Sequence, residues 1–259
     1  MSESKPPAKA KRTRAATDES TQGDSAAASH AWIDHLRGKF LAFEGPDGCG
    51  KSTQYRRFAD LCIASGLGVC EVREPGGTPI GERVRSLLLD KAHSEMGVRC
   101  EMMLYMASRA QLVDERIRPA LAQGKLVLAD RFVASTLVYQ GAAGGLDPQE
   151  ILAVAKAATG GLQPDLNVVF DVDDTIAATR AGIVAPAGRP DVADAQSSLF
   201  ADRMEDRGRE FRRRVRAGYV SLCEQDPARY LRIDASGTPE QVWTLLLGGL
   251  KPRVDAWAE

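Results

Sequence analysis

The 259-residue sequence has no long apolar run. No stretch approaches the roughly 18 apolar residues that a membrane-spanning helix needs, and no apolar segment of the signal-peptide type stands near the start. We therefore expect neither a membrane span nor a secretory leader. Charge of one sign is not in excess either, since 34 Lys and Arg face 35 Asp and Glu. Nothing draws the whole protein to nucleic acid or to a membrane surface, so any attraction for anions has to be local.

Cysteine is scarce and irregularly spaced. The five cysteines are an odd number and include no C-x-x-C pair. This pattern argues against a disulfide framework and against a zinc site, and it favours reduced thiols in the cytoplasm.

The first 30 residues lack the apolar residues of a core. Ala, Ser, Thr, Lys and Pro dominate, and no large apolar residue follows Met1 before residue 30. We expect a disordered extension over residues 1–30. Its basic cluster leaves a mitochondrial-type presequence open as an alternative, and the acidic residues of the same segment count against it. The remaining length and composition predict one folded domain, over residues 37–252.

A glycine-rich turn follows the first strand-like run. Gly45-x4-Gly50-Lys51-Ser52 comes directly after Lys39–Glu44 and before a helix-compatible segment, which is the context of a phosphate-binding P-loop. Backbone N–H groups, Lys51 and the Ser52 hydroxyl would then hold a triphosphate and its Mg²⁺. The residues expected to bind the nucleotide are Gly45, Pro46, Asp47, Gly48, Cys49, Gly50, Lys51, Ser52 and Thr53. Cys49 is interpreted either as a reactive thiol or as a small residue filling a tight turn.

Strand-like runs alternate with helix-length periodic segments along the rest of the chain. This alternation predicts an α/β fold with a mostly parallel sheet. The expected strands are 39–44, 69–73, 126–130, 167–171 and 230–234. The expected helices are 52–65, 81–89, 96–123, 134–139, 148–158, 175–180, 203–225 and 239–247.

The segment over about residues 181–203 breaks the alternation. Gly, Pro, Asp and Ser are mixed there without periodicity, which indicates a mobile loop. Arginines lie in and beside it, among them Arg180, Arg189 and Arg203. Most of the arginines that follow this segment in the sequence are typical of a solvated helix face. Two or three of the arginines in and after the segment are expected to act as a basic lid over a phosphoryl group during its transfer.

Polar residues are also expected where strands end. Asp130 and Arg131 follow the third strand, and Arg73 and Glu74 follow the second; these strand ends face one crevice in a parallel sheet. Asp130 is suited to the Mg²⁺ shell and Arg131 to a second phosphate. Helical spacing brings together Tyr105 with Arg109, and likewise Thr136 with Tyr139 and Gln140.

Taken together, these motifs resemble the thymidylate kinase family. The resemblance runs from Lys39 to about Leu247 and rests on the segments Phe43–Thr53, Arg73–Thr78, Asp130–Phe132, Ser135–Gly141, Pro164–Leu166 and Asp202–Glu205. It implies a three-layer sandwich of the P-loop nucleoside monophosphate kinase type, with five strands, helices on both faces and a mobile lid. It also implies ATP as phosphoryl donor, dTMP as acceptor, Mg²⁺ as cofactor and a homodimer.

The resemblance further implies roles for individual residues. Lys51, Asp47, Arg131, Arg203 and Arg189 would be catalytic, with Ser52 and Asp130 serving Mg²⁺. Some relatives carry a catalytic arginine in the P-loop at the position of Gly48, so here the lid would supply it, and either Arg203 or Arg189 remains open as that residue. The acceptor would be bound by Arg73, Glu74, Arg85, Tyr105, Arg109, Arg131, Ser135, Thr136, Tyr139, Gln140 and Glu205.

Two alternatives stay open at this point. One is a P-loop kinase of another nucleotide or of a deoxynucleoside, for which Arg131 together with the Arg73 loop would be superfluous if the acceptor carried no phosphate. The other is a non-enzymatic or motor-type nucleotide module, that is, a nucleotide switch or a nucleic-acid ATPase. The balanced charge and the lack of an aromatic stacking series count against a nucleic-acid partner.

Overall fold

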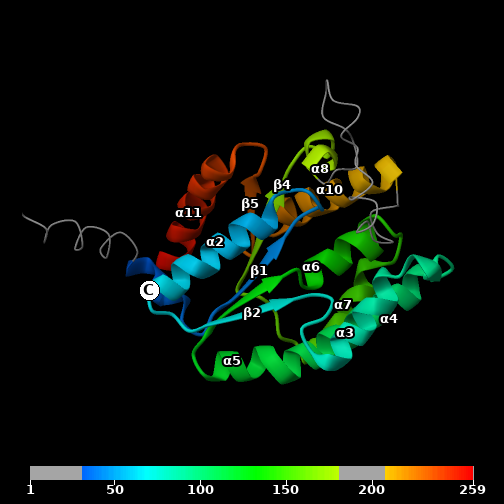
Figure 1. Ribbon diagram of the computed structural model, residues 1–259, viewed down its shortest axis with the longest axis horizontal. Coiled ribbons are helices and arrows are strands. Elements are labelled where there is room, and N and C mark those ends of the chain that lie inside the picture. Colours follow the sequence, from blue (N-terminus) through cyan, green and yellow to red (C-terminus); the bar gives the residue numbers. More distant parts are fainter. Residues whose placement is uncertain (1–30, 181–207, 259) are drawn as a thin grey trace, which may run out of the picture. The chain divides into compact units, whose positions relative to one another are not determined.

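The computed structural model describes residues 31–180 and 208–258. Figure 1 shows a central sheet with helices around it. Its strands are β1 (Phe40–Glu44), β2 (Val69–Arg73), β3 (Leu126–Asp130), β4 (Leu166–Asp171) and β5 (Tyr230–Asp234). The described α-helices are α2 (Lys51–Ala64), α3 (Pro79–Leu89), α4 (Val98–Leu112), α5 (Arg118–Ala122), α6 (Val133–Thr136), α7 (Pro148–Thr159), α8 (Asp174–Arg180), α10 (Gly208–Gln225) and α11 (Pro239–Asp255). Two 3-10 helices, η1 (Ala31–Leu36) and η2 (Lys91–His93), and two π-helical segments, η3 (Val113–Ile117) and η4 (Leu137–Ala142), complete the described elements.

All neighbouring strand pairs of the sheet are parallel. The order is β2-β3-β1-β4-β5: β2 lies at one edge, β3 comes between β2 and β1, and the chain then adds β4 and β5 on the other side of β1. In such a sheet ligands bind beyond the carboxyl ends of the strands, at the point where the strand order reverses. That point is the end of β1, which leads into the glycine-rich turn. The α/β fold is confirmed, and the sheet is wholly parallel rather than mostly so.

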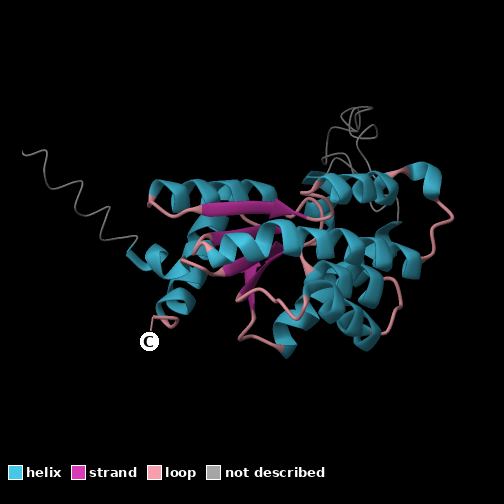
Figure 2. Cartoon of the chain, turned by 90° about the horizontal axis from the view of Figure 1, so that it is seen from below, coloured by secondary structure: helices cyan, strands magenta, loops and turns pink. Residues whose placement is uncertain are grey.

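Alternate residues of the central strands fill two different cores, because side chains on a strand point to opposite faces in turn. Leu41 and Phe43 of β1 pack in a cluster with residues of η1, α2 and α11. Phe40 and Ala42 pack in another cluster with residues of η3 and α5. Helices therefore cover both faces of the sheet, as Figure 2 shows from below. No helix in the described ranges is long and apolar enough to cross a bilayer.

The helix expected over residues 96–123 runs without a gap from Val98 to Ala122, but it is not α-helical throughout. The α-helical geometry of α4 ends at Leu112, and the π segment η3 precedes α5. Pro119 has no N–H and its ring crowds the carbonyl four residues earlier. The Arg118 N–H instead reaches back five residues to the Val113 carbonyl. The predicted span is therefore confirmed to within two residues, and the π turn before Pro119 is the departure from regular α-helix.

Two other helix predictions also need correction. The helix expected over 134–139 is α-helical only to Thr136, and Leu137–Ala142 is π-helical. The last helix continues to Asp255, beyond the expected end at residue 247, with Pro252 inside it. The expected starts at Asp147-Pro148 and Thr238-Pro239 are confirmed, since Asp147 Oδ1 accepts from the Gln149 N–H at 2.9 Å and Thr238 forms a capping box with Gln241.

The residues just after the expected extension pack in the core. Trp32, Ile33 and Leu36 of η1 are buried in the cluster that also holds Val254 of α11. The expected disordered extension itself, residues 1–30, lies outside the described residues.

Candidate active site

The turn after β1 is tightly enclosed by its surroundings. Gly48 has φ +75°, and a Cβ there would lie 2.1 Å from the Ala177 carbonyl oxygen of α8. Only glycine fits this position without moving backbone atoms. Cys49 is 2% exposed and belongs to the core, and its burial raises the pKa of the thiol. Of the two interpretations of Cys49, the structure favours a packing residue.

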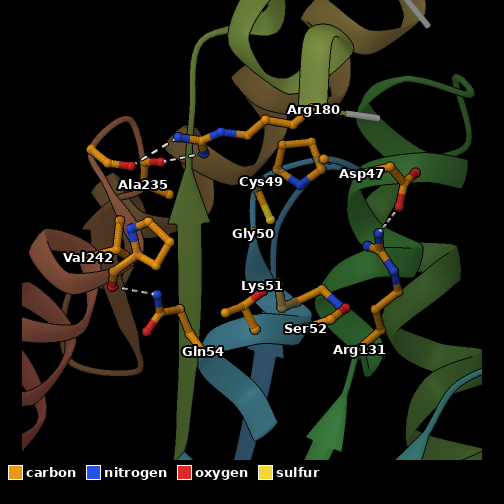
Figure 3. Close-up of a pocket in the computed structure, with 15 residues that line it drawn as sticks. Asp47, Cys49, Gly50, Lys51, Ser52, Gln54, Arg131, Arg180, Ala235 and Val242 are labelled. Atoms are coloured by element: carbon orange, nitrogen blue, oxygen red, sulfur yellow. Dashed lines mark hydrogen bonds and ion pairs between the residues drawn. The ribbon is translucent and has the colours of Figure 1, made fainter. Parts of the chain in front are cut away.

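A cavity of about 420 Å³ lies at this edge of the sheet. Figure 3 shows Lys51 and Ser52 at the start of α2 on its floor, with Arg180 on the far wall from Arg131. Lys51 is almost fully buried, and its Nζ forms an ion pair with the Asp130 carboxylate. The residues that line this cavity are Pro46, Asp47, Gly48, Cys49, Gly50, Lys51, Ser52, Thr53, Gln54, Arg131, Arg180, Ala235, Gly237, Pro239 and Val242.

The wall beside α11 was not predicted from the sequence. Arg180 donates to the carbonyls of Ala235 (2.7 Å), Ser236 (3.1 Å) and Gly237 (3.0 Å), which form the loop between β5 and α11. Gln54 Nε2 donates to the Pro239 carbonyl at 2.9 Å. Within the described part of the chain, the buried Gln54 Oε1 has no hydrogen-bond partner. The sequence signalled only that a helix starts at Thr238-Pro239.

A second cavity of about 240 Å³ lies on the other side of the P-loop lysine. It brings together most of the residues expected to bind the acceptor. Arg73, Glu74, Arg85, Tyr105, Arg131, Ser135, Thr136, Tyr139 and Gln140 line it, along with Asp47, Lys51, Ser52, Pro75, Leu89 and Asp130. Arg109 lies behind this lining. The expected residues Arg189, Arg203 and Glu205, and the expected lid over 181–203, fall outside the described residues.

Arg131 is held between the two cavities. It has φ +70°, an unusual conformation for a residue with a side chain. Its guanidinium donates to Asp47 Oδ1 at 2.5 Å and to the Gly45 carbonyl at 2.9 Å, so it is tied to the glycine-rich turn. Tyr139 stacks under it, with the Arg131 Cζ 5.2 Å from the ring centre, and donates to Asp47 Oδ2 at 3.2 Å.

A fully buried carboxylate lies beneath Arg131. Glu44, the last residue of β1, accepts from the Phe132 N–H (2.7 Å), Ser135 Oγ (2.6 Å) and the Tyr219 hydroxyl (3.1 Å). Burial raises the pKa of this carboxyl group, and the hydrogen bonds from Ser135 and Phe132, together with the nearby Arg131, work against that rise. The Tyr219 hydroxyl also accepts from Arg131 Nη1 at 3.2 Å. Sequence reasoning assigned no role to Glu44 or Tyr219, because no motif connects β1 with α10.

The side chain of Arg109 is fixed by buried partners. Its Nε donates to Glu74 Oε2 at 2.7 Å, and its Nη2 donates to the Phe132 carbonyl (3.0 Å) and to Thr136 Oγ1 (3.1 Å). Burial raises the pKa of Glu74 to about 7, although Arg109 opposes the shift. Glu74 Oε1 has no hydrogen-bond partner among the described residues. Arg109 therefore positions Glu74 and Thr136, which line the cavity.

Ser52 and Asp130 offer oxygen atoms of the kind that Mg²⁺ prefers. Both line the second cavity. The described residues hold no cluster of three or more His, Cys, Asp or Glu side chains suited to a metal. Magnesium in phosphoryl-transfer sites usually takes one or two protein oxygens together with substrate phosphates. The residues present fit that arrangement.

Four residues, Asp47, Lys51, Ser52 and Arg131, line both cavities. A P-loop between two polar cavities, with a lysine and an arginine lining both, is typical of a phosphotransferase. A family model described as "Thymidylate kinase" matches residues 43–245. The chain therefore belongs to the thymidylate kinase family, as the sequence motifs indicated.

Individual relatives agree with this membership. The chain is 42% identical over 199 residues to a thymidylate kinase of Thermoanaerobacter sp., covering 77% of this chain and 90% of the relative. It is 43% identical over 200 residues to one of Pseudomonas fluorescens, covering 77% and 89%. The crystal structure of thymidylate kinase from Ehrlichia chaffeensis is similar with a TM-score of 0.60 and 28% identity, covering 82% of this chain and 98% of that one.

These matches confirm the family, the nucleoside monophosphate kinase-like fold and, at the level of the family, the prediction of a kinase that phosphorylates dTMP. They do not favour the alternative of a non-enzymatic or motor-type module.

Proposed function

We propose that this protein transfers the γ-phosphoryl group of ATP to the phosphate of dTMP and forms dTDP. The observation that carries the proposal is the pair of cavities that share Asp47, Lys51, Ser52 and Arg131. An acceptor phosphate in the smaller cavity would meet a donor phosphate in the larger one beside these side chains. That arrangement suits direct in-line transfer.

The larger cavity receives ATP. The amides of the turn from Gly45 to Thr53 and the Lys51 ammonium bind its phosphates, as expected of a P-loop. The base lies toward the loop that Arg180 holds in place, since this wall is farthest from Arg131 (Figure 3). Gln54, whose Oε1 lacks a partner among the described residues, offers an acceptor on that wall.

The smaller cavity receives dTMP. Arg131 binds its phosphate, and Arg73 and Arg85 contribute positive charge to the same lining. Tyr105 stacks on thymine, and Tyr139 crowds the 2′ position of the sugar. The remaining lining residues of this group are Glu74, Ser135, Thr136 and Gln140. Thr136 and Gln140 bind the polar edge of the base, and Arg109 supports Thr136 with a hydrogen bond.

The reaction needs positioning and charge neutralisation more than a protein nucleophile. A phosphate monoester has a second pKa near 6, so the acceptor oxygen is already ionised at neutral pH. Lys51 and Arg131 offset the repulsion between two anions that are brought together. Mg²⁺, bound with the help of Ser52 and Asp130, supplies further charge neutralisation at the phosphates.

The lid is part of the proposal. Arg203 or Arg189 brings a guanidinium group to the transferred phosphoryl group, and Glu205 meets the sugar from the same side. Both arginines lie outside the described residues. Comparing Arg203→Ala with Arg189→Ala identifies the working residue, since its loss should lower kcat far more than the loss of the other.

An ADP-release assay with ATP and Mg²⁺ tests the function directly. The acceptors dTMP, dUMP, dCMP, dGMP, UMP and thymidine are offered in parallel, with Lys51→Ala as the inactive control. We expect dTMP to be strongly preferred. Turnover of thymidine, or no acceptor better than water, would exclude this function.

We also propose a homodimer. Helices α3, α4 and α7 pack one against the next, and each exposes a large apolar side chain, such as Leu87, Met103 and Leu152. Met103→Asp should shift the molar mass in light scattering from dimer to monomer. An unchanged mass would contradict an interface on α4.

The last part of the proposal concerns organisation and location. The kinase domain spans residues 37–252, and the extension of residues 1–30 takes no part in turnover, so its deletion should leave kcat unchanged. The five cysteines are free thiols, which accords with a cytoplasmic location.

A further inference from the structure

A buried acid outside the cavity contacts one of the residues that line it. Glu101 of α4 is fully buried. It accepts a hydrogen bond of 2.6 Å from Nε2 of Gln140, which lies in the π-helical segment η4 and lines the smaller cavity. Neither the motifs nor the family membership assigns a role to Glu101.

The chemistry of Glu101 fixes which end of the Gln140 amide can face it. The NH2 group of Gln140 donates to Oε1 of Glu101, so the amide oxygen of Gln140 is not used in this contact. The two ends of a glutamine amide are otherwise nearly interchangeable in shape. In the described part of the chain no donor contacts Gln140 Oε1, which leaves this oxygen as an acceptor for a ligand in the cavity.

The Thr136 hydroxyl is left as a donor toward the cavity, whereas Gln140 offers an acceptor. Its Oγ1 accepts from Arg109 Nη2 at 3.1 Å. Arginine has donors only, so the Thr136 hydroxyl hydrogen is not used in that contact and can be donated to a ligand. Arg109 is 1% exposed and is itself held by Glu74 and by the Phe132 carbonyl.

Thr136 and Gln140 therefore present one donor and one acceptor to this cavity. A 4-keto pyrimidine such as thymine or uracil is complementary, because its O4 accepts and its N3–H donates. Cytosine has the reverse pattern, because its 4-amino group donates and its N3 accepts. We propose that Glu101 is a positioning residue that sets the hydrogen-bond polarity of Gln140 and so selects 4-keto over 4-amino pyrimidine nucleotides. This inference rests on the proposed function for the identity of the acceptor.

Glu101→Gln tests the inference with almost no change of volume. A glutamine at residue 101 can accept from Gln140 or donate to it, so the Gln140 amide becomes free to reverse. The kcat/KM ratio of dTMP to dCMP should fall about ten- to hundredfold, the order expected when an unpaired buried polar group becomes paired. The ratio of dTMP to dUMP should stay the same, since both bases carry the 4-keto pattern.

The chain offers a matched control. Glu115 accepts from Gln111 Nε2 at 3.0 Å on the surface of the protein. Glu115→Gln alters the same kind of Glu–Gln contact outside the cavity and should leave both ratios unchanged. Glu101→Asp keeps an acceptor-only carboxylate and should retain more of the selectivity than Glu101→Gln.

Two results would overturn the inference. Equal losses with dTMP and dCMP in Glu101→Gln would make Glu101 a purely structural residue. A fall in the dTMP to dCMP ratio that persists when Gln140→Ala is added would mean that Glu101 acts through another group. Thermal melting checks that each variant is folded.

Calorimetric binding of dTMP, dUMP and dCMP separates this inference from the proposed function. If the protein did not transfer a phosphoryl group to dTMP, turnover would be absent. The change in base preference caused by Glu101→Gln would still be measurable by binding. If the inference were wrong, turnover of dTMP would persist and the preference would not change.

Discussion

The Tyr219 hydroxyl of α10 lies 3.1 Å from Glu44 Oε2, at the end of β1. The contact joins a helix near the carboxyl end of the chain to the strand that leads into the glycine-rich turn. The same hydroxyl is 2.8 Å from Ser135 Oγ and accepts from Arg131 Nη1 at 3.2 Å. Tyr219 thus holds the proposed phosphate-binding arginine and the buried acid in one network.

Tyr219→Phe should weaken both stability and acceptor binding. Without the hydroxyl, Glu44 and Arg131 each lose a buried partner, which costs about 1–3 kcal/mol of unfolding free energy. The KM for dTMP should rise while the KM for ATP changes little. Urea unfolding and steady-state kinetics measure the two effects. Tyr230→Phe is the control, since no hydrogen bond of the Tyr230 hydroxyl is present among the described residues.

Arg180→Ala should affect the donor site selectively. Its three carbonyl contacts hold the loop between β5 and α11, so we expect the KM for ATP to rise about tenfold, the order of one lost charge-assisted hydrogen bond. The KM for dTMP should not change. Arg253→Ala removes a comparable arginine, which donates to the carbonyls of Pro227 and Ala228 away from the cavities. Equal effects of both variants on the KM for ATP would contradict a specific role of Arg180.

The strands were predictable because each is a short apolar run bounded by turn residues. The observed bounds of β2, β3 and β5 match those expected, and β1 and β4 differ by one residue at their start. The π-helical segments were not predictable from hydrophobic periodicity. Their hydrogen bonds depend on local details such as Pro119 and on the packing of side chains from other elements.

The candidate site was predictable where one short motif holds the residues. Lys51, Asp130 and Arg131 lie in such motifs, and each lines the smaller cavity. Glu101 and Tyr219 are single residues on long helices, and only folding brings them to Gln140 and Glu44. Helical spacing put Arg109 on one helix face with Tyr105, but it could not show that Arg109 lies behind the cavity lining and donates to Thr136.

Glu74 should make stability depend on pH. Burial raises the pKa of this acid from its usual 4.5 to about 7. Between these values the folded state holds a proton that the unfolded state has lost, so the free energy of unfolding contributed by Glu74 falls as the pH rises. Glu74→Gln removes the titrating group and should flatten this fall between about pH 5 and 7. Urea unfolding at several pH values measures it, with the exposed Glu224→Gln as control. Parallel curves for wild type and Glu74→Gln would show that Glu74 does not titrate in this range.

Gly48 should not tolerate any side chain. Its φ of +75° disfavours other residues, and an added Cβ would lie 2.1 Å from the Ala177 carbonyl oxygen. Gly66 is the matched control, because its φ is +83° and an added Cβ would meet nothing within 4 Å.

Gly66→Ala should cost only the backbone strain, about 1–2 kcal/mol of unfolding free energy. Gly48→Ala carries the same strain and must also displace either α8 or the glycine-rich turn, so it should cost clearly more and impair ATP binding. Chemical unfolding and the KM for ATP measure both effects. Since Gly48→Arg adds the same Cβ, an arginine cannot be placed in the turn of this chain without moving backbone. This favours the lid as the source of the catalytic arginine. Equal stabilities of Gly48→Ala and Gly66→Ala would refute the steric argument.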